Sequence, residues 1–280
     1  MLKIVRIRDV LTKCPLTRFY TRKVSLPAIG ADLQKEIDKM QRFRSSDQPP
    51  IVWKHIEKTD KDGKRLKFTI QEIPEDRYED AVEHMCANFL ADEPTCNCLN
   101  AINDPIFVQD ISTLWRLLIV EGISIAAFID NPNGGKPIIA GMNAMGIDTK
   151  NQKDSISGYQ FKSEKCKNTF DIVSKATKIV YERYGVDKYL YAIGLSVEPD
   201  YRGYGLGKDI LKMRDLVGPK YGVPATSTAF TAINSQKSAA GAGFEVFYTK
   251  KFADCVDENG KEYFPGINSK EFQIMGKRLL

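Results

Sequence analysis

The chain has 280 residues, of which 41 are Lys or Arg and 36 are Asp or Glu, giving a formal net charge of +5. With 42% hydrophobic and 28% charged residues, the composition excludes a disordered or fibrous chain and allows a sizeable core. No apolar run reaches the roughly 18 residues of a transmembrane helix, and the start has no secretory signal. Six cysteines are too sparse for a disulfide scaffold, and Cys96 and Cys98 lack zinc-ligand spacing. We therefore expect reduced thiols, no metal and a cytoplasmic protein.

The positive charge is concentrated at the start of the chain. Residues 1–30 hold seven basic side chains and one acidic one, whereas the remaining 250 hold 34 and 35. This basic segment favours either a packed or solvated extension or, alternatively, a mitochondrial targeting peptide. The polar, proline-containing stretch at 45–50 predicts a turn or linker. We thus divide the chain into a basic extension, 1–50, and a single domain, 51–280. The neutral body predicts no nucleic-acid or membrane partner and favours a monomer.

The first half of the domain predicts two hairpins separated by helices. Alternating runs at 51–57 and 66–73 flank a Lys-Asp-Gly-Lys turn and predict paired strands. Helices are expected from Pro74 and after Asp104-Pro105. Apolar runs at 123–129 and 138–147 flank an Asn- and Gly-rich turn, which predicts an antiparallel hairpin.

The second half alternates between helices and strands. After a polar loop at 148–167, we expect a helix at 169–184 ended by Gly185, a strand at 188–197, a helix at 206–217, a strand at 224–230, a helix at 234–242, and strands at 244–252 and 271–280. The order predicts an α/β (α+β) fold. Its sheet is mostly antiparallel and mixed, flanked by helices, with one parallel strand–helix–strand step between 188 and 230.

The clearest chemical signal lies between the strand at 188–197 and the following helix. The glycines at 203, 205 and 207 permit tight or positive-φ backbone, so successive N–H groups can converge on an anion. Arg202 and Lys208 add positive charge, and the pattern predicts a diphosphate-binding loop. A P-loop is excluded because three residues, not four, separate Gly203 from Gly207. The dinucleotide fingerprint is excluded because its glycine spacing differs.

The pattern Arg202-x-x-Gly205-x-Gly207, preceded by Val197-x-Pro199-x-Tyr201, resembles the acetyl-CoA pyrophosphate loop of the GNAT superfamily of N-acetyltransferases. The resemblance implies the GNAT fold, acetyl-CoA as co-substrate, and a cleft where the strand before the loop splays from its parallel neighbour. It also implies a main-chain N–H as oxyanion donor. The residues implied for acetyl-CoA are Leu195, Ser196 and Val197 at the acyl end, Arg202, Gly203, Tyr204, Gly205, Leu206, Gly207 and Lys208 at the pyrophosphate, and Asn234 in a second segment.

A second match concerns the segment Asp92-Glu93-Pro94. It is similar to the Asp-Glu-Pro segment of the insect arylalkylamine N-acetyltransferases, which acetylate dopamine, serotonin and tyramine and whose Glu is the proposed general base. Two acids at a helix terminus oppose the helix dipole, which favours a non-structural role. The resemblance also implies proton handling by Ser235 and by Thr231, which stands in place of a Ser. The acid to the leaving thiolate is left open, and no cysteine is expected to carry the acyl group.

The chemistry explains the need for a base. A primary amine with a pKa near 10 is about one part in a few thousand neutral at pH 7, and its protonated form has no lone pair for attack. An ordinary glutamate removes that proton efficiently only when buried or relayed through water. We therefore hypothesise that Glu93 acts through a water chain in a partly apolar cleft.

Three functions stay open at this point. The first is acetyl transfer to a small amine, most simply an arylalkylamine, by direct transfer. The second is a polyamine, agmatine or protein-amine acetyltransferase. The third is a catalytically silent acyl-CoA-binding protein, against which Glu93 and the glycine loop argue.

Overall fold

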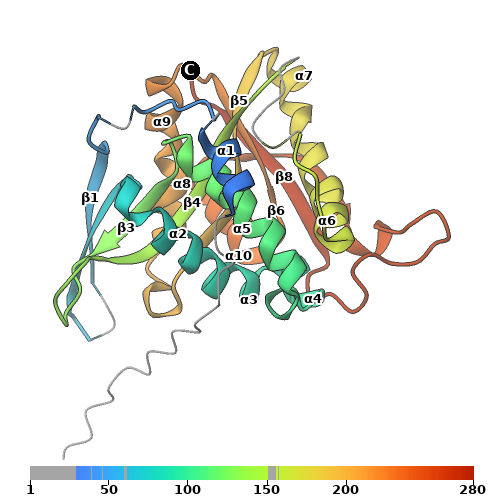
Figure 1. Ribbon diagram of the computed structural model, residues 1–280, viewed down its shortest axis with the longest axis horizontal. Coiled ribbons are helices and arrows are strands. Elements are labelled where there is room, and N and C mark those ends of the chain that lie inside the picture. The colour runs from blue at the N-terminus through green and yellow to red at the C-terminus, as the bar shows by residue number, and fades with distance from the viewer. Residues whose placement is uncertain (1–29, 39, 46, 60–61, 151–155, 157) are drawn as a thin grey trace, which may run out of the picture.

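The computed structural model describes residues 30–38, 40–45, 47–59, 62–150, 156 and 158–280. A single eight-stranded sheet crosses the described part in the order β1-β2-β3-β4-β5-β6-β8-β7 (Figure 1). Only the β5–β6 pair is parallel, so the predicted mixed, mostly antiparallel fold is confirmed. The strands are β1 (Val52–Thr59), β2 (Arg65–Glu72), β3 (Ile125–Ile129), β4 (Ile138–Thr149), β5 (Lys188–Val197), β6 (Ala225–Phe230), β7 (Glu245–Lys251) and β8 (Glu271–Arg278).

Helices cover both faces of this sheet because its strands are apolar on both sides. In β3, Ala126 and Phe128 pack in the cluster that contains α2 (Tyr78–His84) and α5 (Pro105–Val120). The alternate residues Ile125 and Ala127 pack with α8 (Leu206–Lys212) and α9 (Arg214–Lys220) on the opposite face. The predicted hairpin between β3 and β4 is confirmed. No helix among the described residues is long and apolar enough to cross a membrane.

The helical segments differ from the expected ones where their turns change type. The helix from Pro74 continues beyond α2 as a π-helical turn, Met85–Phe89, and α3 (Leu90–Asp92). The helix expected at 169–184 is α6 (Glu164–Ser174), a 3₁₀ segment and α7 (Val180–Tyr184), and it ends, as expected, at a left-handed Gly185. The helix expected at 206–217 is divided at Met213 into α8 and α9. The remaining helices are α1 (Ala31–Asp38), α4 (Pro94–Cys98) and α10 (Ile233–Gly241).

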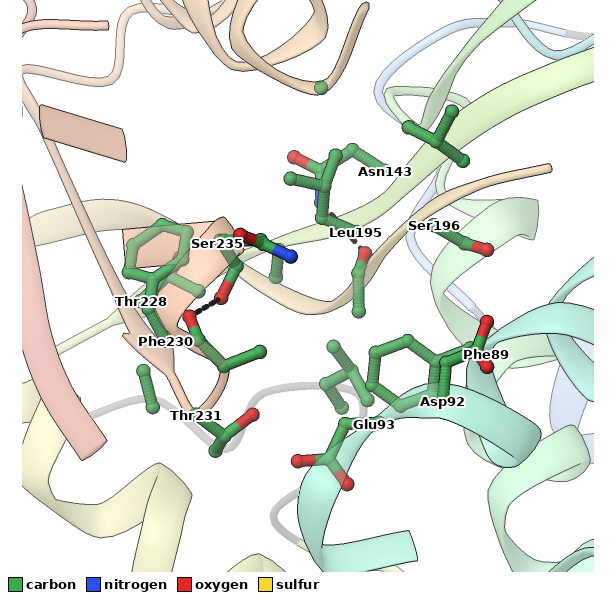
Figure 2. Close-up of a pocket in the computed structure, with 18 of the residues that line it drawn as sticks. Phe89, Asp92, Glu93, Asn143, Leu195, Ser196, Thr228, Phe230, Thr231 and Ser235 are labelled. Carbon is green, nitrogen blue, oxygen red and sulfur yellow. Dashed lines mark hydrogen bonds between the residues drawn. The ribbon is translucent and has the colours of Figure 1, made fainter. Parts of the chain in front are cut away.

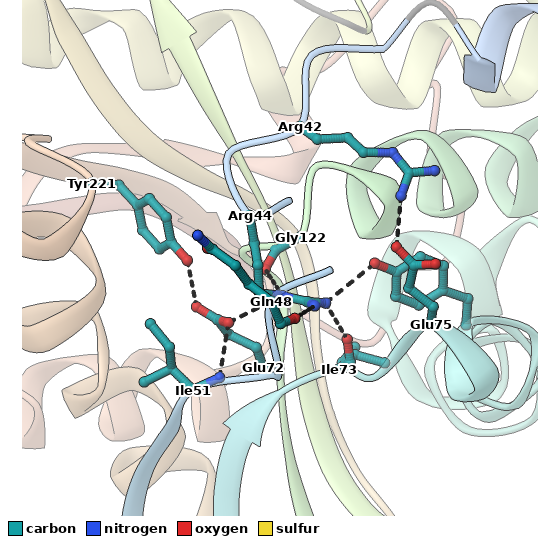
Figure 3. Close-up of polar contacts among 10 residues, drawn as sticks. Arg42, Arg44, Gln48, Ile51, Glu72, Ile73, Glu75, Gly122 and Tyr221 are labelled. Atoms are coloured by element: carbon teal, nitrogen blue, oxygen red, sulfur yellow. Dashed lines mark hydrogen bonds and ion pairs between the residues drawn. The ribbon is translucent and has the colours of Figure 1, made fainter. Parts of the chain in front are cut away.

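Residues 30–50 pack onto the domain where the structure describes them. Ile37 of α1 is buried against Leu117 and Val120 of α5. Further along, Arg44 forms a buried ion pair with Glu72 of β2, at 3.2 Å between Nε and Oε2 (Figure 3). This part of the chain is thus a packed element of the fold. The boundary at residue 50 stays a prediction, and the targeting hypothesis for residues 1–30 falls almost entirely on residues outside the described ones.

Candidate active site

A cleft opens where the parallel strands β5 and β6 diverge. The two strands pair only at Leu190 and Thr226, and beyond that point they separate, as the resemblance implied. The divergence leads into a cavity of about 820 Å³. Figure 2 shows the side chains around it, contributed by β5, β6, the end of α3 and the start of α10. The topology therefore brings segments more than a hundred residues apart to one site.

The strand β5 carries a bulge at the cleft. Leu195 is paired with Asn143 and Ala192 with Met145, so Ile193 and Gly194 together face a single residue of β4. Gly194 has φ +99°, and a Cβ added there would lie 2.4 Å from Cε of Met85. Glycine is required at this position both by the conformation and by the close packing.

Side chains from two other elements hold the bulged carbonyl groups. Trp115 Nε1 on α5 donates to the Ile193 carbonyl over 2.8 Å, and Asn143 Nδ2 donates to the Gly194 carbonyl over 2.8 Å. Sequence analysis missed these roles. A glycine inside an apolar strand and an asparagine inside the apolar run at 138–147 are the signals that could have found them.

The register of β4 and β5 fixes where the backbone of the cleft strand points. Glu198 N–H donates to the Ala140 carbonyl over 2.9 Å, at the edge of the register that pairs Val197 with Gly141. Bonded and non-bonded pairs alternate along an antiparallel ladder. Leu195 and Val197 therefore direct their N–H and C=O groups toward β6, whereas Ser196 faces β4. The Val197 carbonyl accepts from Arg202 Nε at 2.7 Å, which agrees with a carbonyl that points away from β4.

The glycine loop follows directly and enters α8. Gly203 and Gly205 have φ of +88° and +73°, and no side chain caps the start of α8. Arg202 forms an ion pair with Asp92, so its charge is shared with the carboxylate beside Glu93. Of the eleven residues expected to bind the co-substrate, Tyr204 and Lys208 do not line the cavity. The other nine do: Leu195, Ser196, Val197, Arg202, Gly203, Gly205, Leu206, Gly207 and Asn234.

Glu93 lies on the cavity wall and directly follows the last residue of α3, so the expected helix end is present. The expectation that Glu93 has no structural role there is wrong, because the same residue begins the next helix. It is the N-cap of α4, and its Oε2 accepts from Cys96 N at 2.7 Å and from the Thr95 hydroxyl at 2.5 Å. The other oxygen, Oε1, is buried and has no hydrogen-bond partner among the described residues. One oxygen of Glu93 thus caps α4, and the other is left without a hydrogen-bond partner in a residue that lines the cavity.

The two expected hydroxyl residues lie on the wall opposite Glu93 (Figure 2). Thr231 follows β6 directly and is buried. Ser235 stands in the first turn of α10, where its Oγ donates to the Ala232 carbonyl over 2.7 Å. The structure therefore gathers Glu93, Thr231 and Ser235 around one cavity, although they come from separate parts of the chain.

Two cysteines line the cavity, which the sequence did not predict. Cys96 on α4 and Cys166 on α6 both contribute to the wall. Burial raises the pKa of the Cys96 thiol well above its usual range, with Glu93 adding to the effect. Burial likewise raises the pKa of Cys166 strongly. Both thiols are therefore protonated and poorly nucleophilic at neutral pH. Within the described residues, no group of three potential ligands could hold a metal ion.

Arg214 at the start of α9 also borders the cavity. Its guanidinium donates to Asn143 Oδ1 on β4 and to the hydroxyls of Thr226 and Thr228 on β6. Burial lowers its pKa to about 9. Nothing in the sequence pattern separated this arginine from the surface residues of its helix.

The fold and the cleft together define an N-acetyltransferase of the GNAT class, and comparisons with known proteins agree. Neither the models of protein families nor the curated proteins give a match. Among solved structures, 31% identity and a TM-score of 0.75 relate the chain to a protein of the yellow fever mosquito Aedes aegypti, provisionally named arylalkylamine N-acetyltransferase 7. That match covers 86% of this chain and 100% of the mosquito chain.

Two further structures share the fold at lower identity. Arylalkylamine N-acetyltransferase 2 of Aedes aegypti is 24% identical, with a TM-score of 0.63 over 76% of this chain and 99% of that one. The polyamine N-acetyltransferase of Drosophila melanogaster, which forms N-acetylagmatine, is 16% identical, with a TM-score of 0.60 over 75% and 99%. The chain belongs to the GNAT N-acetyltransferases, in the family of the insect arylalkylamine N-acetyltransferases, and is an acyltransferase.

Proposed function

We propose that the protein transfers an acetyl group from acetyl-CoA to the primary amine of a small arylalkylamine such as dopamine, serotonin or tyramine. The observation that carries the proposal is the position of Glu93. Glu93 lines the same cavity as the glycine loop and β5, and its Oε1 has no hydrogen-bond partner among the described residues. A base, an anion-binding loop and backbone donors are the groups that acyl transfer to an amine requires.

The loop residues fit the diphosphate of the co-substrate. Gly203 and Gly205 adopt the positive φ that turns backbone N–H groups onto an anion, and nothing lies within 4 Å of the place where a Cβ of Gly203 would be. When bound, acetyl-CoA supplies the activated acyl group. Leu195, with its N–H directed toward β6, would donate to the carbonyl oxygen of that group as negative charge develops there.

The reaction balances with the residues present. The ammonium group loses one proton toward Glu93, directly or through water, and its lone pair then attacks the acyl carbon. A C–N bond forms and gives a tetrahedral intermediate, whose nitrogen gives up its second proton as the C–S bond breaks. That proton passes to the departing thiolate, with the hydroxyls of Thr231 and Ser235 on the opposite wall as the relay, and Glu93 returns the first proton to solvent. Direct transfer is supported by the protonated, buried state of Cys96 and Cys166.

The walls of the cavity support an aromatic amine. Six aromatic side chains among the described residues line it: Phe89, Phe107, Phe170, Tyr191, Tyr201 and Phe230. Its acidic lining among the described residues is Asp92 and Glu93, and Asp92 is already paired with Arg202. One available carboxylate suits a ligand with one cationic amine and an apolar ring better than a polyamine. The names of the two mosquito relatives point to the same substrate class.

A steady-state screen tests the proposal directly. With acetyl-CoA held at saturation, dopamine, serotonin and tyramine are compared with agmatine, spermidine and a lysine peptide. We expect kcat/KM for at least one arylalkylamine to exceed that for agmatine and spermidine. Turnover restricted to polyamines or the peptide would overturn the substrate class, and acetyl-CoA binding without turnover of any amine would overturn the reaction.

A Glu93→Gln substitution tests the base. Gln keeps an oxygen that can cap α4, so the fold is retained while the base is lost. We expect kcat at pH 7 to fall about 10²- to 10⁴-fold with little change in acetyl-CoA affinity. The residual rate should rise about tenfold per pH unit below the pKa of the amine, because only its neutral fraction reacts. A variant that folds, binds acetyl-CoA and keeps full kcat would exclude Glu93 as the base.

A further inference from the structure

We propose that Arg214 is a positioning residue for acyl transfer, which orients and polarises the Leu195 N–H through the Asn143 side chain and the Gly194 peptide group. This inference rests on the proposed function and extends it from the reacting groups to the device that holds them. Arg214 comes from α9, on the face of the sheet away from α2 and α5. Its place at the floor of the cleft is decided by the tertiary structure alone.

The contacts form a continuous chain from the cation to the cleft strand. Arg214 Nε and Nη2 donate to Asn143 Oδ1 over 3.2 and 2.8 Å. This fork fixes which end of the amide faces Arg214, so Nδ2 faces the Gly194 carbonyl, 2.8 Å away. Figure 2 shows Asn143 beside Leu195 at the cavity. The side chain of Asn143 is wholly buried, so the arrangement has little freedom to change.

The same guanidinium also spans the point where the strands diverge. Its Nη1 donates to the hydroxyls of Thr226 and Thr228, each over 2.8 Å. The Thr226 hydroxyl in turn donates to the Leu190 carbonyl of β5 over 2.7 Å. Arg214 thereby ties β4 to β6 across the bulge of β5. The width of the cleft and the direction of its backbone groups depend on one side chain.

The geometry of the peptide unit carries the effect to the cleft. In a trans peptide the C=O and N–H groups point in opposite directions. Because Asn143 holds the Gly194 carbonyl, the N–H of Leu195 is directed away from Asn143, toward β6 and the cavity. Each hydrogen bond in such a series polarises the next one, so a cation at its start makes the last N–H a stronger donor.

The charge of Arg214 is unusual because no carboxylate among the described residues forms a hydrogen bond or ion pair with it. Its four hydrogen bonds all go to neutral oxygens, and its planar group lies over the Phe244 ring at 5.5 Å. Burying a charge among neutral groups opposes stability, and an apolar residue of similar volume would avoid that cost. With a pKa near 9 the group still carries its charge at neutral pH. A role in the reaction explains a charge that stability does not.

Arg214→Met, Arg214→Lys and Asn143→Asp test the inference, with Arg44→Lys as the matched control for a buried arginine outside the site. We expect Arg214→Met to lower kcat roughly 10- to 100-fold while the affinity for CoA, which has no acyl group, changes less than about threefold. Arg214→Lys should recover part of the loss because it keeps the charge. Arg44→Lys should leave kcat unchanged.

Asn143→Asp keeps a side chain of the same size beside Arg214 but removes the hydrogen bond that connects Arg214 to the Gly194 peptide group. Its carboxylate still accepts from Arg214 and offsets the charge, but it has no donor for the Gly194 carbonyl. We expect a folded variant whose kcat falls about as far as that of Arg214→Met. This variant keeps the test decisive if Arg214→Met fails to fold.

A spectroscopic measurement separates this inference from the proposed function. Difference infrared spectra of acetyl-CoA labelled at the carbonyl should show a downward shift of the thioester band on binding to the wild-type protein, and the shift should shrink in Arg214→Met and Asn143→Asp. If no amine is turned over but the shift is present and sensitive to these variants, the function fails and the inference stands. Equal shifts in all proteins, or full kcat in Asn143→Asp, would overturn the inference. Failure to bind acetyl-CoA would overturn both.

Discussion

Arg44 and Arg214 are both buried, but the protein stabilises their charges in opposite ways. Arg44 lies in the N-terminal segment, where Glu72 provides a carboxylate at 3.2 Å and the carbonyls of Ile73 and Gln48 accept at 3.0 Å (Figure 3). Arg214 lies at the floor of the cleft with only neutral acceptors. The charges of Arg44 and Glu72 neutralise each other, whereas the positive charge of Arg214 has no neighbouring carboxylate to neutralise it.

With the role proposed for Arg214, the difference separates a part of the molecule that serves the fold from a part that serves the reaction. A neutralised ion pair whose polar atoms are all hydrogen-bonded holds one segment of chain in a single register, and it has no free charge with which to bind a ligand. A cation without a neighbouring carboxylate raises the electrostatic potential in a cleft where a substrate develops negative charge. Because the cation is already in place, the protein does not have to reorganise during the reaction. The two regions therefore predict different consequences for the loss of the same residue type.

His84, near Arg202, shows a third way to manage a buried basic group. Burial lowers its pKa to about 4, and the neighbouring Arg202 acts in the same direction. The imidazole therefore gives up its proton and is neutral at pH 7. An arginine cannot do this at neutral pH, so it needs either a carboxylate, as at Arg44, or a functional reason to stay charged, as at Arg214.

The largest loss of stability is expected when the ion pair between Arg44 and Glu72 is broken. Arg44→Met leaves Glu72 buried without its cation and should lower the free energy of unfolding by about 3–5 kcal/mol. Arg42→Met is the control, because Arg42 and Glu75 form an exposed pair, and it should cost less than about 1 kcal/mol. Denaturant unfolding measures both. Equal small losses would show that the buried pair contributes no more than the exposed one.

The same measurement on Arg214→Met sharpens the contrast. No carboxylate is left behind there, so we expect a loss of only about 1–2 kcal/mol, from the hydrogen bonds to Asn143, Thr226 and Thr228. If Arg214→Met destabilised the protein as much as Arg44→Met, the two arginines would have the same structural role.

A loss smaller than that of Arg44→Met is expected at the bulge that Arg214 supports. Gly194→Ala combines a positive φ with a Cβ 2.4 Å from Met85 Cε, and should cost about 2–4 kcal/mol. Gly134→Ala is matched in φ, at +78°, but has nothing within 4 Å, so it should cost only the backbone strain, about 1–2 kcal/mol. Thermal unfolding distinguishes the two, and similar losses would show that Met85 moves aside without cost.

A pH dependence is expected from His84, and it has no effect at neutral pH. In the unfolded chain a histidine takes up a proton near pH 6.5, whereas the folded protein resists protonation of His84 until about pH 4. The stability from this group is therefore complete above pH 6.5 and is lost as pH falls toward 4, by at most about 3 kcal/mol.

His84→Gln should remove this part of the pH dependence. The difference in unfolding free energy between wild type and variant, measured from pH 7 to pH 4.5, isolates it from the titration of the carboxyl groups. The exposed His55 provides the control, since His55→Gln removes a histidine side chain that is not buried. A flat difference for His84→Gln would mean that folding does not lower the pKa of the His84 imidazole.

The strands were predictable because their signals are local. Alternating polarity and the turns at 61–64 and 130–135 define both hairpins, and β5 begins and ends where its apolar run does. The helices were less accurate. Short segments such as α4 have too few residues for a periodic pattern, and α4 is the reason that Glu93 is an N-cap as well as the end of α3.

Sequence alone determined the fold class, the glycine loop and the identity of the residues around it, because turn chemistry, periodicity and motif spacing are written along the chain. Only the tertiary structure decided that Glu93, Thr231 and Ser235 share one cavity, that Tyr204 and Lys208 stay outside it, and that two cysteines enter it. It also placed Arg214 beneath the bulge. Those contacts join residues far apart in sequence, and they depend on how β5 and β6 diverge, which no local pattern encodes.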